Sequence, residues 1–213
     1  MKSIAAASFI VLSALAGQAF AQQSESGWYA GISAGQSKAN VDSGSVLPVV
    51  GATQSRVSTD DTDTAFKLFG GYRFNRHFAL EGGYADLGSF KATRTVTAPA
   101  AGSISGDFKV SGIFFQAVGI IPLGDKFSIF GSAGLFANEV KTSASTTGPI
   151  VLLNGSSASH SDSNLKLGIG AGFDFTDKIG VRIEWERFFE LGDQSVGATM
   201  DVDLVTIGVV FRF

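Results

Sequence analysis

The last eleven residues of the chain, 203–213, alternate between two kinds of position. The odd positions after Asp203 are large and apolar: Val205, Ile207, Val209, Phe211 and Phe213. The even positions are mostly smaller or polar and end with Arg212. A period of two is typical of a β-strand with one apolar face. A soluble sandwich would bury this face against a second sheet, whereas a transmembrane barrel would turn it towards lipid.

Seven other stretches of the chain show the same alternation. They cover residues 28–37, 64–74, 78–87, 108–121, 127–139, 165–175 and 179–186. The clearest is 165–175, where leucine, isoleucine and phenylalanine alternate with Lys166, glycines and Asp174. The stretches 108–121 and 127–139 are apolar on both faces, so the pattern leaves their orientation open. Together with the terminal stretch, the pattern predicts eight strands.

The segments between these strands alternate in length. Residues 75–77, 122–126 and 176–178 are short enough for tight turns. The segments 38–63, 88–107, 140–164 and 187–200 are long and rich in Ser, Thr, Gly, Ala and Asp, which favours loops. Apolar residues at 46–50 and 149–153 suggest hairpins that extend beyond the membrane. Short turns at one end and long loops at the other are typical of bacterial outer-membrane barrels, with the loops outside the cell.

The two faces of the predicted strands differ in charge. The aromatic-rich faces carry almost no ionisable residues. The opposite faces carry Lys67, Arg73, Glu81, Lys166, Asp174, Arg182, Glu184, Glu186 and Arg212. A charge that faces lipid at the midplane costs about 2–4 kcal/mol, so these side chains are expected in the barrel interior. The pattern therefore predicts an all-β, eight-stranded antiparallel up-and-down transmembrane β-barrel, in preference to a soluble lipocalin-like barrel.

The first 21 residues have the three parts of a signal peptide. Lys2 is followed by an apolar stretch from Ile4 to Leu15, and Ala19-Phe20-Ala21 matches the A-x-A cleavage pattern. The apolar stretch is too short to span a bilayer as a helix. We therefore expect two segments: a cleaved signal peptide, 1–21, with Ala19 and Ala21 at the cleavage site, and a barrel domain, 22–213.

Composition agrees with an exported membrane protein. Charged residues make up 16% of the chain, below the roughly 25% usual for soluble domains. The chain has no cysteine, so no disulfide can stabilise it. A net charge of −3 without basic clusters gives no electrostatic reason to bind nucleic acid.

Four segments resemble the OmpA-type outer-membrane barrel. Residues 69–75 (FGGYRFN) and 80–84 (LEGGY), with Leu87-Gly88 following, resemble its second hairpin. Residues 180–185 (GVRIEW) and 207–213 resemble its last two strands. The chain is similar to the barrel-only, opacity-type surface proteins, which lack a peptidoglycan-binding domain. The resemblance implies that Phe213 acts as the assembly signal read by the barrel insertion machinery.

The resemblance also implies an interior ion-pair switch, which this chain matches at Glu81 and Arg182. The positions of the partner lysine and the partner acid are occupied by Val118 and Gly172, so half of the switch is absent. The interior charges are then best interpreted as a paired polar core, because an eight-stranded barrel is filled by its own side chains. A gated small pore is the functional alternative.

Residue chemistry gives little support for catalysis or metal binding. His77 falls in a predicted tight turn, and His160 lies within a polar segment, 159–162, without a strand-anchored acid. We expect no metal and no cofactor. Gly35, Gly168, Gly170 and Gly172 lie on strand faces and are predicted to be packing residues.

These observations predict a monomeric protein of the bacterial outer membrane with four external loops. The expected role is structural or surface-interactive, in envelope integrity or adhesion. The expected partners are outer-membrane lipid, the barrel assembly machinery, and host or environmental ligands at the loops, but not nucleic acid. A narrow small-solute channel is the second hypothesis, and a barrel-embedded lipid hydrolase is the weakest.

Overall fold

The computed structural model describes residues 26–41, 54–98, 102–147, 157–193 and 198–213. The predicted signal peptide with Ala19 and Ala21, and the apolar segments 46–50 and 149–153, lie outside these ranges.

The described residues form nine strands. Their bounds are β1 Gly27–Val41, β2 Gln54–Asp60, β3 Thr62–Asn75, β4 Phe78–Ala98, β5 Gly102–Pro122, β6 Phe127–Thr147, β7 Ser157–Asp174, β8 Ile179–Asp193 and β9 Ala198–Arg212. All neighbouring strands pair antiparallel. Within the described ranges, no helix is long and apolar enough to cross a membrane.

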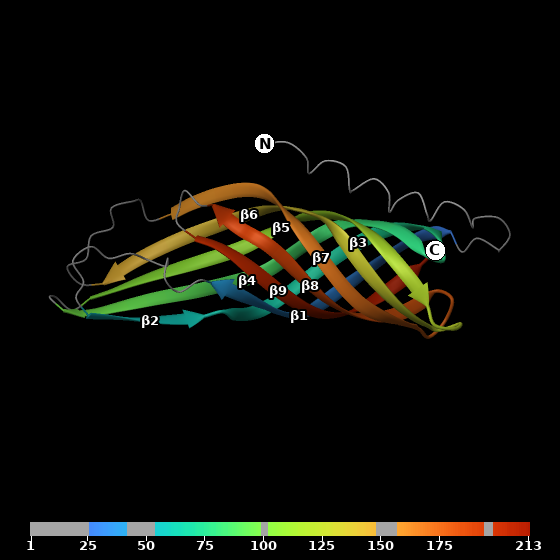
Figure 1. Cartoon of the computed structure of the whole chain (residues 1–213), viewed down its shortest axis with the longest axis horizontal. Coiled ribbons are helices and arrows are strands. Elements are labelled where there is room, and N and C mark those ends of the chain that lie inside the picture. Colours follow the sequence, from blue (N-terminus) through green and yellow to red (C-terminus); the bar gives the residue numbers. More distant parts are fainter. Residues whose placement is uncertain (1–25, 42–53, 99–101, 148–156, 194–197) are drawn as a thin grey trace, which may run out of the picture.

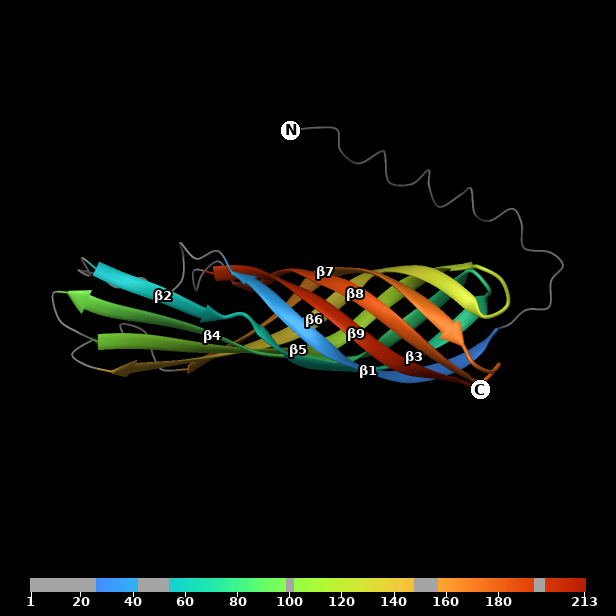
Figure 2. The same ribbon diagram turned by 90° about the horizontal axis from the view of Figure 1, so that it is seen from below.

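Eight of these strands close into a ring. The order is β1, β3, β4, β5, β6, β7, β8 and β9, and β9 pairs back to β1 with Ala34 opposite Ile207. Among the described residues, the remaining strand, β2, pairs only with residues 91–98 of β4. Figures 1 and 2 show the tilted strands wrapping around a common axis. The predicted eight-stranded antiparallel barrel is confirmed.

The predicted long loops are largely wrong, because most of their described residues continue the strands. β4 runs to Ala98 and β5 begins at Gly102, so 88–107 is mainly a hairpin. The segment 140–164 likewise lies mostly in β6 and β7. In the same way, 38–63 contributes to β1, β2 and β3, and 187–200 to β8 and β9. Outside the membrane both faces of a strand can meet water, so such a strand does not need alternating apolar residues.

Side chains alternate between the outside and the interior of the barrel, which settles the orientation of β5 and β6. In β5, Ile113 and Phe115 are exposed, whereas Phe114 and Gln116 are buried. In β6, Leu135 is 59% exposed and the neighbouring Phe136 is fully buried. Both strands have two apolar faces because one contacts lipid and the other fills the barrel.

Large apolar side chains cover the outside of the ring. Those more than half exposed include Trp28, Ile32, Phe66, Leu68, Ile113, Phe115, Leu135, Ile169, Ile183 and Ile207. One end of the barrel carries the turns at 76–77, 123–126 and 175–178. Near this end, successive ring contacts join Trp28 to Tyr72 (centroid distance 5.1 Å), Tyr72 to Phe74 (5.1 Å) and Phe74 to Phe78 (5.7 Å). An apolar band with an aromatic rim is the surface expected of a lipid-embedded barrel. We call this end the short-turn end and the opposite end the outer end.

The interior is filled in layers. Towards the outer end lies an apolar cluster that includes Leu87, Phe90, Val110, Phe114, Phe136, Phe188, Leu191 and Val202. A smaller cluster near the short-turn end contains Ala79, Val118, Ile120 and Phe130. Polar and charged side chains occupy the layer between the two clusters. This layer is the candidate site.

Candidate functional site

The layer between the two apolar clusters contains three cations and three acids. Lys67, Lys166 and Arg182 supply the positive charges, and Glu81, Glu184 and Glu186 the negative charges. No side chain of the six is more than 8% exposed. Together with Gln116, we call these seven residues the interior network. Its formal charge is zero, which a buried cluster requires if it is not to carry an uncompensated charge.

The two lysines connect β3 and β7 to β8. The Nζ of Lys67 lies 2.5 Å from Oε2 of Glu184 and 2.6 Å from Oε2 of Glu186. Lys166 donates to Oε1 of Glu186 and to Oε1 of Gln116, the latter at 2.7 Å. Glu186 is therefore shared by both ammonium groups. Because residues two apart in a strand face the same side, β8 places Arg182, Glu184 and Glu186 in one inward row.

Glu81 is the acceptor at the other side of the network. Arg182 donates to it through Nη1 at 2.6 Å and Nη2 at 3.3 Å, Gln116 through Nε2 at 2.7 Å, and the Tyr29 hydroxyl at 2.9 Å. Arg182 also reaches Oε2 of Glu184 at 2.8 Å. These contacts join the lysine part and the arginine part into one continuous network.

Aromatic rings and glycines surround these charges. The guanidinium of Arg182 lies 4.0 Å from the ring centroid of Phe69, and the ammonium of Lys166 lies 4.2 Å from that of Phe114. Such cation–π contacts attract each cation electrostatically to the face of the ring. Gly170 has no side chain, which leaves space on the inner wall for the ring of Phe130. A Cβ at residue 170 would lie 2.4 Å from Cζ of Phe130. The predicted packing role of the strand glycines agrees with this close approach.

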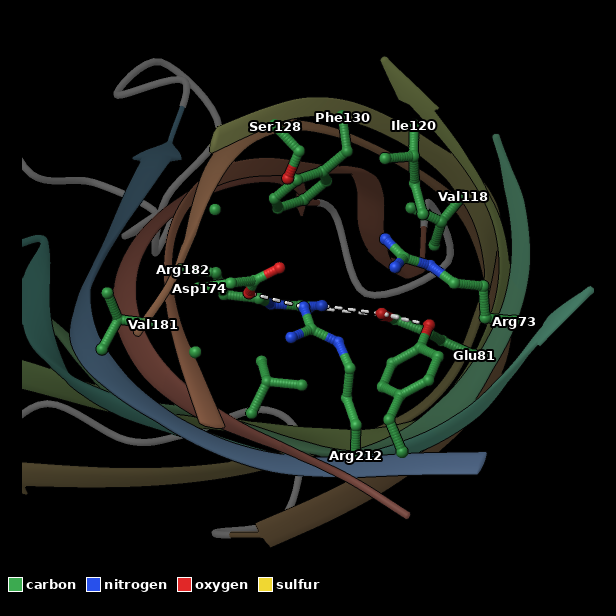
Figure 3. A pocket seen from close by; sticks show the side chains of 14 residues that line it. Arg73, Glu81, Val118, Ile120, Ser128, Phe130, Asp174, Val181, Arg182 and Arg212 are labelled. Carbon is green, nitrogen blue, oxygen red and sulfur yellow. Dashed lines mark hydrogen bonds and ion pairs between the residues drawn. The ribbon is translucent and has the colours of Figure 1, made fainter. Parts of the chain in front are cut away.

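Three of the predicted interior charges, Arg73, Asp174 and Arg212, are not among the seven residues of the interior network but lie next to it. Arg73 and Asp174 are near the short-turn end, where Arg212 donates to Oδ1 of Asp174 at 2.7 Å. With Arg182 and Glu81, they line a cavity of about 60 Å³. Figure 3 shows the three guanidinium groups of Arg73, Arg182 and Arg212 pointing into this space. Val118 and Gly172, where the resemblance placed the missing switch partners, line the same cavity.

Sequence reasoning missed two members of this arrangement. Gln116 is the polar residue among apolar neighbours in β5, so its inward position depended on an orientation that the pattern left open. Tyr29 alternates with Trp28 in the predicted strand 28–37 and so lies on the opposite face, but no signal in the sequence indicates that its hydroxyl contacts Glu81, 52 residues away. The period-two pattern identifies the face of a strand and not the partner across the barrel.

Neither histidine belongs to the interior network. His77 is in the turn between β3 and β4, with Nδ1 3.2 Å from the carbonyl oxygen of Ile120. His160 was expected in a loop but lies in β7, where its backbone pairs with Val140. Among the described residues, no group of three or more His, Cys, Asp and Glu is arranged to hold a metal ion.

The predicted assembly signal lies at the short-turn end. The side chain of Phe213 is 83% exposed, and its backbone N–H donates to the carbonyl oxygen of Trp28 at 3.0 Å. Phe213 is therefore fixed through its backbone while its ring stays on the outer surface. Its role in assembly stays a prediction.

Solved outer-membrane barrels are similar in structure. Neisserial surface protein A is 17% identical with a TM-score of 0.53, and 87% of this chain aligns with 97% of that chain. The outer membrane protein OprG from Pseudomonas aeruginosa is 18% identical with a TM-score of 0.50, over 88% of this chain and 96% of that one. The attachment invasion locus protein Ail of Yersinia pestis is 21% identical with a TM-score of 0.47, over 88% of this chain and 99% of that one.

These identities support the shared fold alone. No curated protein sequence matches this chain. The family model described as "Outer membrane protein beta-barrel domain" matches residues 7–213. This match covers the closed ring of strands, the lipid-facing band and the interior network, and the chain therefore belongs to the outer membrane protein β-barrel domain family.

Proposed function

We propose that this protein is a monomeric, non-conducting barrel of the bacterial outer membrane that has a structural and surface-interaction role. The observation that carries the proposal is the continuation of β4, β5, β6 and β7 beyond the lipid-facing band, with β2 beside β4. Figures 1 and 2 show these strands projecting from the ring at the outer end. Surface protein function needs such a part outside the membrane.

The outward face of this projecting sheet is polar. On β5 the exposed apolar positions end at Ile113, and the outward positions beyond it are Ser111, Lys109, Asp107, Ser105 and Ser103. On β6 they end with Leu135 and Ala137, and Glu139, Lys141, Ser143 and Ser145 follow. At about 3.4 Å per residue, the polar part of β5 is roughly 30 Å long. Such a surface is compatible with water, sugars or a protein partner, and not with hydrocarbon.

The filled interior favours this role over the alternative, a narrow small-solute channel. The interior network spans the lumen, and the apolar cluster with Phe114, Phe136 and Phe188 lies on its outer side. An ion would have to break buried ion pairs and then cross an apolar layer, which is strongly unfavourable. We expect no single-channel steps in planar bilayers, and regular steps would favour the channel.

The surface role can be tested by shortening the projecting sheet. Thr93 lies directly opposite Ser105, and Ser143 directly opposite Ser157, so each pair can be joined by an Asn-Gly turn. Cells that make the shortened protein should lose attachment to epithelial cells or abiotic surfaces. The barrel should still fold, which a shift in gel mobility on boiling would verify. Unchanged attachment with a folded barrel would contradict adhesion, and detergent sensitivity of a deletion strain would then test envelope integrity.

A further inference from the structure

We propose that water from the periplasmic side enters the barrel at the short-turn end, is bound beside the charged row of β8, and is stopped by the apolar cluster towards the outer end. The charged row consists of Arg182, Glu184 and Glu186, which are all buried. Short turns of outer-membrane barrels face the periplasm, so the cavity at this end faces that compartment. The proposal concerns the barrel interior and does not rest on the surface role of the projecting sheet.

The cavity at the short-turn end is the entrance for water. Its volume is about 60 Å³, and a buried water needs at least about 10–15 Å³. Ser128 and Arg182 belong to its lining, and Figure 3 shows the polar groups of both side chains pointing into the open space. Several water molecules therefore fit here, in contact with the first residue of the charged row.

Beyond the cavity, polar atoms of the charged row lack a protein partner. Arg182 Nε and Glu184 Oε1 are buried and have no hydrogen-bond partner among the described residues. The hydroxyl of Ser33 on β1 is buried and unpaired within the same ranges. Nearly all buried polar groups are hydrogen-bonded to protein or to ordered water, so these three atoms indicate bound water.

The strand register directs these three atoms towards one space. Ser33 on β1 lies opposite Gly208 on β9, and Gly208 lies opposite Arg182 on β8. A Cβ at Gly208 would collide with the Ser33 hydroxyl, so this hydroxyl reaches over the glycine towards β8. Glu184 follows Arg182 on the same inward face. A water in this space has one donor, one acceptor and one hydroxyl as partners, and a buried water typically makes about three hydrogen bonds.

A second serine is arranged in the same way on the other side of β8. Ser132 on β6 lies opposite Gly168 on β7, which lies opposite Glu186. A Cβ at Gly168 would lie 2.5 Å from Oγ of Ser132 and 3.1 Å from Cγ of Glu186, so both side chains border the same space. The Ser132 hydroxyl is also buried without a partner in the part of the chain that the structure describes. Water bound here extends the hydration to the last residue of the charged row.

Apolar side chains end this hydrated region. Phe114, Phe136 and Phe188 belong to the apolar cluster towards the outer end, and Phe136 and Phe188 are fully buried. The rings of Phe136 and Phe188 are in contact, with a centroid distance of 4.8 Å. A water molecule in this layer would lose its hydrogen bonds, which is unfavourable. The short-turn end is therefore the side from which water reaches the charged row.

The test is NMR of the mature protein in nanodiscs, with the arginine Nε–H groups and the phenylalanine rings protonated in a deuterated chain. We expect a cross-peak between water and Arg182 Nε–H, and none between water and the rings of Phe136 and Phe188. S128L fills the cavity with an apolar side chain. It should slow the deuterium exchange of Arg182 Nε–H at least about tenfold, because exchange would then require a local opening. S143L makes the same change on the outward face of the projecting sheet and should leave the rate unchanged.

Three outcomes would overturn the proposal. Absence of the Arg182 cross-peak would mean that this donor is buried without water. Equal exchange rates in S128L and the wild type would mean that water does not enter through the cavity. Water contacts at Phe136 and Phe188 as strong as that at Arg182 would mean that the apolar cluster does not stop water. The gel mobility shift on boiling verifies that each variant folds, and if S128L does not fold, S128V makes the same test with a smaller side chain.

Discussion

Arg182 and Glu81 are joined by two contacts across the barrel, Nη1–Oε1 at 2.6 Å and Nη2–Oε2 at 3.3 Å. They belong to β8 and β4, which lie four strands apart in both directions around the ring of eight. The pair therefore connects opposite walls that share no backbone hydrogen bonds. Because both side chains are buried, the loss of one partner leaves the other as an uncompensated charge.

We expect R182A to lower the free energy of unfolding by about 3–5 kcal/mol, the usual cost of breaking a buried ion pair from one side. Glu81 and Glu184 would both lose their guanidinium donor. The measurement is the urea midpoint of the folded form in detergent, read by gel mobility without boiling. The temperature at which the folded form disappears from the gel should fall as well.

Two controls separate the pair from a general loss of charge. The double variant E81Q/R182M leaves two lysines and two glutamates in the interior network, so its formal charge stays zero and it should be more stable than R182A. K141Q breaks an exposed pair, Lys141–Glu139 at 3.5 Å, and should cost less than about 1 kcal/mol. An R182A midpoint equal to that of the wild type would show that the interior network does not stabilise the barrel.

Gly35 lies at the seam where β1 closes against β9. A Cβ at this position would lie 1.8 Å from the carbonyl oxygen of Val205 and 2.7 Å from Cα of Thr206, both backbone atoms. Because the backbone cannot move without opening the seam, we expect G35A to reduce the heat-resistant fraction strongly. Gly70 is the matched control, since its Cβ would have 3.7 Å to the nearest atom. Equal behaviour of G35A and G70A would contradict the close approach at the seam.

The eight strands of the ring could be predicted because lipid imposes alternation on every strand that crosses it, whereas β2, which lies outside the ring, was not predicted. The outer parts of β4 to β7 could not be predicted, since their outward faces carry polar residues where no lipid imposes alternation. The orientation of β5 stayed open because Phe114 fills the interior while Ile113 and Phe115 contact lipid. For the outer parts of β4 to β7 and for the orientation of β5, the sequence does not indicate whether a strand face contacts lipid, water or the barrel interior.

The sequence pattern gives the inward face of each charge but not its partner. Lys67 and Glu186 are 119 residues apart, and their 2.6 Å contact exists only after the ring closes. Five strand pairings separate β3 from β8 in one direction around the ring and three in the other, so the contact depends on the register of all of them. The cavity that Arg73 and Asp174 share with Glu81 and Arg182 likewise depends on the height of each residue in the barrel.

Ile207 tests which face of the barrel contacts lipid. It is 65% exposed and lies in the middle of the apolar row of β9. I207R would place a charge near the bilayer midplane, so we expect a loss of about 2–4 kcal/mol in unfolding experiments in lipid vesicles. S143R places the same residue on the outward face of the projecting sheet and should change stability by less than about 0.5 kcal/mol, as surface substitutions usually do. Equal costs would place the membrane elsewhere on the barrel.

Substitution of Phe213 can distinguish an effect on assembly in the cell from an effect on the stability of the folded barrel. Its ring is 83% exposed, so F213A removes little packing, and the backbone bond to Trp28 is retained. We expect F213A to unfold in vitro within about 0.5 kcal/mol of the wild type. In cells, however, the amount of folded protein in the outer membrane should fall several-fold, because the insertion machinery would lose its aromatic signal. F213Y keeps an aromatic ring and should restore the amount. Normal insertion of F213A would remove the assembly role, whereas a large loss of stability in vitro would show that the ring acts in the folded barrel.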